Sequence, residues 1–137
     1  MLKPMPRIIV FVLSLLIFQP ELAKADSYLK TTSNKLLYKW NGQHLVSPTN
    51  KSLYKWDGTT ISDPSNKRLY KWDGTYLSDP SNKRLFKWDG THISSISNKR
   101  LYKIHDSHIM DMSNKRLYKI DGQIPAAILI ALVMGLI

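Results

Sequence analysis

The chain contains no cysteine among its 137 residues, and it has only 6 glycines and 3 phenylalanines. Disulfide bonds, thiol catalysis, cysteine–zinc sites and iron–sulfur clusters are therefore excluded. Acidic residues are also scarce, with 10 Asp and Glu against 20 Lys and Arg, and the formal net charge is +10. A small basic domain without disulfides has to be held together by packing or by a partner.

Residues 1–25 have the three parts of a secretory signal peptide. Two basic residues come first, an apolar run of 11 residues extends from Ile8 to Phe18, and Ala23-Lys24-Ala25 supplies a small-x-small cleavage pattern. The run is short for a membrane-spanning helix, which needs about 20 residues, although an uncleaved anchor is the alternative. We expect a secreted or cell-envelope protein that begins at Asp26 after cleavage.

The other end of the chain, Ile124–Ile137, reads IPAAILIALVMGLI and carries no charge. As a helix it would reach about 21 Å, which is short of a hydrocarbon core of about 30 Å. It could anchor the protein in a membrane, lie in the membrane interface, cap the repeats described next, or be removed by processing. We expect membrane association, because a soluble chain would have to bury this apolar surface elsewhere.

Between the two ends, six units of 16 residues follow one another without gaps, beginning at positions 33, 49, 65, 81, 97 and 113. We interpret residues 33–123 as one repeat domain and 26–32 as a linker. The unit Ser65–Pro80 reads SNKRLYKWDGTYLSDP, and in every unit the second place is Asn and the seventh is Lys. The last two units have Ile where the others have Trp, as expected of terminal repeats.

Each unit predicts a β-hairpin, because Asp-Gly or Asn-Gly between two β-prone runs favours a type I′ turn. A two-residue turn at Asp73-Gly74 would place Trp72 opposite Thr75 and Tyr70 opposite Leu77. A second turn is expected at Asp79–Asn82. The fold class is therefore all-β, with six tandem hairpins in an antiparallel meander, a closed barrel, a radial flower or a hairpin solenoid, followed by a short apolar helix.

Alternation along the strands gives each hairpin an aromatic face and a lysine-rich face. Aromatic side chains of the sixth and eighth places could form the core, stack on sugars or cage a cationic group, or do both in a cleft. The candidate ligand residues are Trp40, Trp56, Trp72, Trp88, Tyr38, Tyr54, Tyr70 and Phe86.

The basic side chains recur at fixed spacing and predict an anionic partner, because regular spacing lets weak contacts add. The candidates for polyanion binding are Lys67, Arg68, Lys71, Lys83, Arg84, Lys87, Lys99, Arg100 and Lys103. Outside the cell the available polymers are lipopolysaccharide, teichoic acid, anionic lipid surfaces and sulfated glycans. Single-stranded nucleic acid also suits aromatic and basic side chains, but we expect no specific nucleic acid.

No catalytic pattern is visible in the sequence, and we expect neither an enzyme, a cofactor nor a metal site. His105 and His108, with Asp106 and Asp111, resemble a metal cluster, but solvated polar residues around a degenerate turn explain them. Asp57, Asp73 and Asp89 are explained by turn formation in the same way.

The segments LYKWDGTYLS and LFKWDGTHIS, within residues 33–124, resemble bacterial surface proteins built from tandem aromatic β-hairpins. The choline- and cell-wall-binding repeats and the radial β-flower proteins are of this kind. The resemblance implies a non-catalytic envelope protein whose Trp and Tyr columns bind a ligand. We therefore expect binding of an anionic or glycan surface polymer. The alternative is a structural, self-associating envelope or fibre protein whose strand edges pair between chains.

Overall fold

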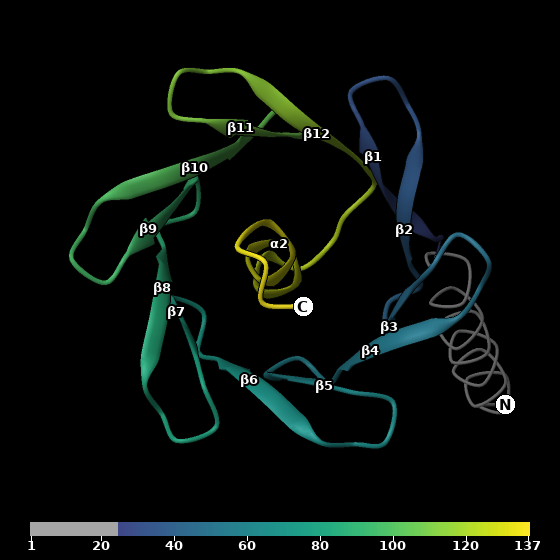
Figure 1. Ribbon diagram of the computed structural model, residues 1–137, viewed down its shortest axis with the longest axis horizontal. Helices are drawn as coiled ribbons and strands as arrows, with labels where there is room; N and C mark the ends of the chain where they lie inside the picture. The colour runs from purple at the N-terminus through teal and green to yellow at the C-terminus, as the bar shows by residue number, and fades with distance from the viewer. Residues whose placement is uncertain (1–24) are drawn as a thin grey trace, which may run out of the picture.

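A computed structural model describes residues 25–137, so nearly all of the predicted signal peptide lies outside the described residues. The described chain forms strands followed by one helix (Figure 1). The strands are β1 (Ser27–Thr31), β2 (Leu36–Trp40), β3 (His44–Val46), β4 (Ser52–Trp56), β5 (Thr60–Ser62), β6 (Arg68–Trp72), β7 (Tyr76–Ser78), β8 (Arg84–Trp88), β9 (His92–Ser95), β10 (Arg100–His105), β11 (His108–Asp111) and β12 (Arg116–Asp121), and the helix is α2 (Ala126–Val133).

The strands form a closed antiparallel barrel in which each strand pairs with its sequence neighbours and β1 pairs with β12. Figure 1 shows six hairpins pointing outwards around α2. We call these hairpins petals; each consists of an odd-numbered strand and the following even-numbered one. Outer turns, such as Asp79–Lys83, close the petals, and inner turns, such as Asp73–Tyr76, join one petal to the next. Among the predicted arrangements, the structure is therefore the closed barrel, and its hairpins radiate from the axis.

Strand β1 closes the ring, so the expected linker at residues 26–32 is wrong. The sixth unit contributes only its first strand, β12, and β1 supplies the missing partner, with Leu29 opposite Ile120. Tyr28–Lys35, YLKTTSNK, is in fact the second half of a repeat followed by the start of the next, as in YLSDPSNK. The ring closes because the two halves of one unit stand at opposite ends of the repeat domain.

The inner turns differ from the prediction by one residue. Trp72 lies opposite Leu77, so the loop is centred on Gly74 and Thr75. The physical reason is the Asp73 carboxylate, whose Oδ1 accepts the backbone N–H groups of Thr75 (2.8 Å) and Tyr76 (2.7 Å) and so extends the turn. Gly74 follows with φ +98°, a conformation that a Cβ would strain. Trp72 thus pairs with Leu77, two residues beyond the predicted partner Thr75. A shift by an even number of residues leaves each side chain on its predicted face of the sheet.

The outer turns match the expected turn at Asp79–Asn82. The Asn82 N–H donates to the Asp79 carbonyl at 3.0 Å, and the Asp79 N–H donates to the Lys83 carbonyl at 2.9 Å. Asn82 has φ +71°, which is the left-handed residue that follows a β-turn in a three-residue hairpin loop. The Asn of every unit has a φ between 69° and 72°, so this place needs a residue that tolerates left-handed backbone.

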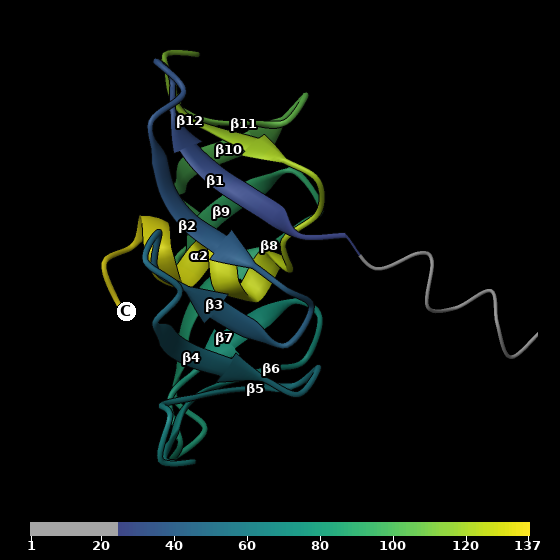
Figure 2. The ribbon, with the colours of Figure 1, turned by 90° about the vertical axis from the view of Figure 1, so that its right-hand side faces the viewer.

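The core lies between the inner wall of the ring and α2, which runs along the ring axis (Figure 2). Each petal contributes one buried aliphatic side chain to this wall: Leu29, Leu45, Ile61, Leu77, Ile93 and Ile109. On the helix, Ala127 to Ala131 are all buried. A helix that is apolar on all sides is stable only where it is surrounded, and here the ring surrounds it.

The apolar tail is therefore part of the core, and its association with a membrane stays a prediction. Within residues 25–137, no helix has both the length and the apolar character needed to cross a bilayer. The Ile residues of the last two units also fit this arrangement. Ile104 and Ile120 line the same 520 Å³ space as Ile124, Pro125 and Leu129, where the chain turns from the ring into the helix. Because Ile is smaller than Trp, Ile104 and Ile120 leave room for the segment that leads from β12 into α2.

Candidate binding surface

The aromatic candidates pack in or against the core, and two of them, Trp56 and Trp72, also line grooves between petals that are described below. Trp40 is buried, and the other seven rings are half-buried and pack against the core. The same holds for Tyr102 and Tyr118, the aromatic residues of the last two units. This position gives the aromatic columns a packing role, and ligand binding by them stays a prediction.

The seventh-place lysines, by contrast, join neighbouring petals. The Lys71 ammonium on β6 donates to Asn82 Oδ1, in the outer turn of the next petal, at 2.9 Å. The same hydrogen bond recurs around the whole ring: Lys39–Asn50, Lys55–Asn66, Lys71–Asn82, Lys87–Asn98, Lys103–Asn114 and, across the closure, Lys119–Asn34. Three polyanion candidates, Lys71, Lys87 and Lys103, thus also have a structural contact that the sequence analysis missed. The signal was present, because Lys and the Asn of the next unit are both invariant in all six units.

The third- and fourth-place bases lie elsewhere, at the outer turns on the periphery of the ring. Lys67, Arg68, Lys83, Arg84, Lys99 and Arg100 are all exposed. Between Ala25 and Ile137, the ion pairs are Lys30–Asp121 and two His–Asp contacts, so none of these six bases belongs to an ion pair. The outer rim therefore offers the basic side chains that are most available to a partner.

Acidic side chains of the outer turns are engaged with the backbone. Asp79 Oδ1 accepts the Lys83 N–H, the Ser81 hydroxyl and the Ser81 N–H, each at 2.9 Å, and these bonds hold the pKa of the carboxyl below its ordinary value. Asp63 and Asp111 are arranged in the same way, with pKa values lowered by the same kinds of bond. The carboxylates stay ionised, yet each is used to fix a turn.

A groove repeats between neighbouring petals on the outer side of the ring. We define it by five places: the seventh-place Lys, the ninth-place Asp or Asn, the twelfth- and fourteenth-place side chains, and the Asn of the next unit. The first groove (Lys39, Asn41, His44, Val46, Asn50) has a volume of about 290 Å³, the second (Lys55, Asp57, Thr60, Ser62, Asn66) about 240 Å³, and the third (Lys71, Asp73, Tyr76, Ser78, Asn82) about 390 Å³. The same polar surface is thus presented at successive positions around the ring.

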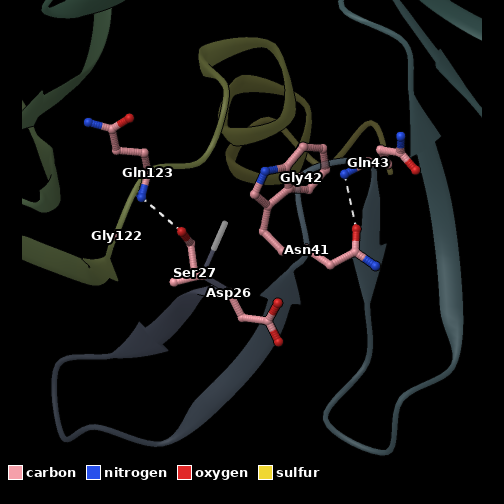
Figure 3. A pocket seen from close by; sticks show the side chains of 9 residues that line it. Asp26, Ser27, Asn41, Gly42, Gln43, Gly122 and Gln123 are labelled. Carbon is pink, nitrogen blue, oxygen red and sulfur yellow. Dashed lines mark hydrogen bonds between the residues drawn. The ribbon is translucent and has the colours of Figure 1, made fainter. Parts of the chain in front are cut away.

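A larger cavity of about 710 Å³ lies at the closure of the ring (Figure 3). In this cavity Ser27 Oγ accepts the Gln123 N–H at 2.9 Å, and a Cβ on Gly122 would lie only 2.3 Å from the same oxygen. Its lining includes Asp26 as the one titratable side chain. These contacts join β1 to the end of β12, so we assign the cavity to ring closure.

His105 and His108 both contact Asp106. His108 Nδ1 lies 2.8 Å from the Asp106 carbonyl, and His105 Nε2 lies 3.4 Å from the Asp106 carboxylate. Across the described part of the chain, no three His, Cys, Asp or Glu side chains are grouped so that they could hold a metal ion. Asp57, Asp73 and Asp89 each accept backbone N–H groups of an inner turn, as the turn interpretation predicted.

Compared with protein-family models, with curated proteins and with solved structures, the chain has no significant match in any of the three.

Proposed function

We propose that the protein is an exported, non-catalytic binding protein of the cell envelope that engages an anionic or glycan surface polymer through the outer side of its ring. The observation that carries this proposal is the position of the unpaired bases. Outer turns on successive petals each present an exposed Lys–Arg pair: Lys67–Arg68, Lys83–Arg84, Lys99–Arg100 and Lys115–Arg116. Because the petals radiate (Figure 1), the outer turns that carry these pairs lie around the rim.

Several weak contacts suit a polymer better than a small ligand. An exposed ion pair contributes only about 0–1 kcal/mol, which is too little for useful affinity on its own. A polymer that follows the rim can make several such contacts at once, and the effective concentration of the later contacts is high. The repeated grooves between the petals add hydrogen-bond donors and acceptors along the same path.

The carboxylates support a binding role more than a catalytic one. Glycoside chemistry needs two carboxyl groups free to act on the substrate, whereas the inner- and outer-turn aspartates have an oxygen occupied by backbone N–H groups. The closed sheet also weakens the structural alternative, since in the described barrel each strand has a partner on both sides. Edge-to-edge fibre formation needs a free edge.

Replacing the four rim arginines by serine, the residue that the second unit carries as Ser52, tests the proposal. Heparin and lipoteichoic acid serve as probes, neutral dextran as the control polymer, and surface plasmon resonance as the readout at two salt concentrations. We expect the native protein to bind the anionic polymers less tightly at higher salt. The fourfold variant should lose about tenfold or more in affinity, the sum of four exposed contacts. Native protein that retains neither polymer at low salt would overturn the proposal.

A further inference from the structure

The third groove differs from the other two in holding an arginine over an aromatic ring. The Arg84 guanidinium carbon lies 3.9 Å from the centroid of the Tyr76 ring, and both residues line this groove together with Lys71. We propose that this groove, between petals β5–β6 and β7–β8, binds one acidic sugar unit of the polymer, a pyranose that carries a carboxylate or sulfate group. The inference rests on the proposed function and specifies the ligand class of one site within it.

Arg84 is prepared for an anion before any ligand arrives. The contact with the Tyr76 ring holds the guanidinium group in place, so less side-chain freedom is lost when its N–H groups bind a carboxylate or sulfate. Arg84 forms no ion pair within residues 25–137, which leaves its N–H edge available. A planar fork of donors matches the oxygens of such a group in two-point contact.

The Lys71 ammonium adds a second positive group to the groove. It is held in place by the hydrogen bond to Asn82, which uses one of its three donors. The opposing charge in the groove is Asp73, but its Oδ1 already accepts two backbone N–H groups. The two cations against one engaged carboxylate favour an anionic ligand at this place.

The remaining lining suits a sugar ring. Thr59, Thr60 and Ser78 bring hydroxyl groups, which can both donate to and accept from sugar hydroxyls, and the half-buried Trp72 brings an apolar surface. The groove volume of about 390 Å³ falls in the range of small-molecule sites, about 300–1,000 Å³. The third groove thus offers both hydrogen-bonding groups for the sugar hydroxyls and an apolar surface for the sugar ring.

The neighbouring grooves provide comparisons inside the same molecule. The first groove has Ser52 at the fourth place of the next unit, so it lacks the arginine. The second groove has Thr60 where the third has Tyr76, so Arg68 has no ring beneath it. Both grooves share the Lys–Asn hydrogen bond with the third. Among the three grooves, the combination of Arg84 and Tyr76 occurs in the third alone.

Isothermal titration calorimetry of the purified protein tests this inference. The probes are tetragalacturonate and a heparin tetrasaccharide, and neutral maltotetraose is the control. The variants are Arg84→Ser and Tyr76→Thr, with Arg68→Ser as the matched control of equal charge change; Ser52 and Thr60 show that each new residue is compatible with the repeat. Thermal unfolding of each variant establishes that it is folded.

We expect one saturable site for an acidic tetrasaccharide and no saturable heat with maltotetraose. Arg84→Ser and Tyr76→Thr should each weaken binding at least tenfold, whereas Arg68→Ser should change it less than twofold. Equal losses in Arg84→Ser and Arg68→Ser, or equal affinity for maltotetraose, would overturn the site while leaving rim binding of long polymers intact. Failure to bind long anionic polymers would instead overturn the proposed function itself.

Discussion

Two sets of basic side chains that recur with the period of 16 residues occupy different regions of the molecule. The seventh-place lysines lie between petals and donate to the Asn of the next unit, whereas the third- and fourth-place bases lie exposed at the outer turns. The seventh place is Lys in all six units, but the fourth place is Arg in only four, with Leu36 and Ser52 in the first two. The fourth place therefore varies at the rim, whereas the third place, also at the rim, is Lys in all six units, just as the seventh place is.

The largest effect should come from the inner wall behind both regions. Leu77→Ala removes a fully buried side chain that lies against the core around α2. We expect a loss of about 2–5 kcal/mol in the free energy of unfolding, measured by urea denaturation followed through Trp fluorescence. A loss below about 1 kcal/mol would mean that the ring does not pack on the helix as described.

A smaller effect is expected at the link between petals. Asn82→Ala removes both the acceptor of the Lys71 hydrogen bond and a residue suited to φ +71°. The two losses together should cost about 1–3 kcal/mol. Asn82→Gly separates them, because it keeps the left-handed backbone and removes only the hydrogen bond. If Asn82→Gly were as damaging as Asn82→Ala in the same urea experiment, backbone conformation would not be the reason for the invariant Asn.

The comparison between the two basic regions can be tested directly with Lys71→Met and Arg68→Ser. Lys71→Met should lower stability by about 0.5–1.5 kcal/mol, since it removes a hydrogen bond between petals. Arg68→Ser should stay within about 0.5 kcal/mol, as expected of an exposed side chain without a partner. Arg68→Ser should also weaken polymer binding, because it removes one positive charge from the rim. The opposite order of stabilities would remove the distinction between the regions.

The smallest effect concerns acid and the outer turns. The pKa of Asp79 is lowered in the folded protein, chiefly by the N–H of Lys83, so its contribution to stability is present above the unfolded value of 3.8 and is lost as the pH falls below it. Ser47 occupies the equivalent place in the first unit and accepts the equivalent N–H of Lys51 at 3.0 Å. Asp79→Ser should therefore fold normally and show a weaker decline of melting temperature between pH 5 and pH 2, within the range of carboxyl titration. An unchanged decline would show that this carboxylate is not responsible.

Local features of the fold were predictable from the sequence. The period, the two turns of each unit and the assignment of Trp72 and Lys71 to opposite faces depend on neighbouring residues alone. The pairing of Trp72 with Leu77 was not predicted, because the Asp73 side chain replaces a backbone acceptor and shifts the inner turn. The half repeat at Tyr28–Lys35 was visible in the sequence, but its meaning depends on β12 at the far end of the chain.

The candidate site was only partly predictable for a similar reason. The sequence indicates a basic face, and the structure divides its side chains between inter-petal contacts and the exposed rim. The contact of Arg84 with Tyr76 joins the neighbouring strands β7 and β8, whereas simple alternation would place the fourth-place Arg on the aromatic face and the twelfth-place Tyr on the lysine-rich face. The bulge between Leu77 and Ser78 alters the alternation locally and brings Arg84 to the outer side.

By itself, the sequence determined that six like units form antiparallel hairpins with one apolar and one basic face, because alternation and turn chemistry act over a few residues. Only the tertiary structure decided that the units close into a ring, that β1 completes the last of them, and that the apolar tail fills the centre. Closure depends on strand tilt and register accumulated around the whole sheet, which no single unit contains. The interior formed in this way is what gives the apolar helix a place away from water.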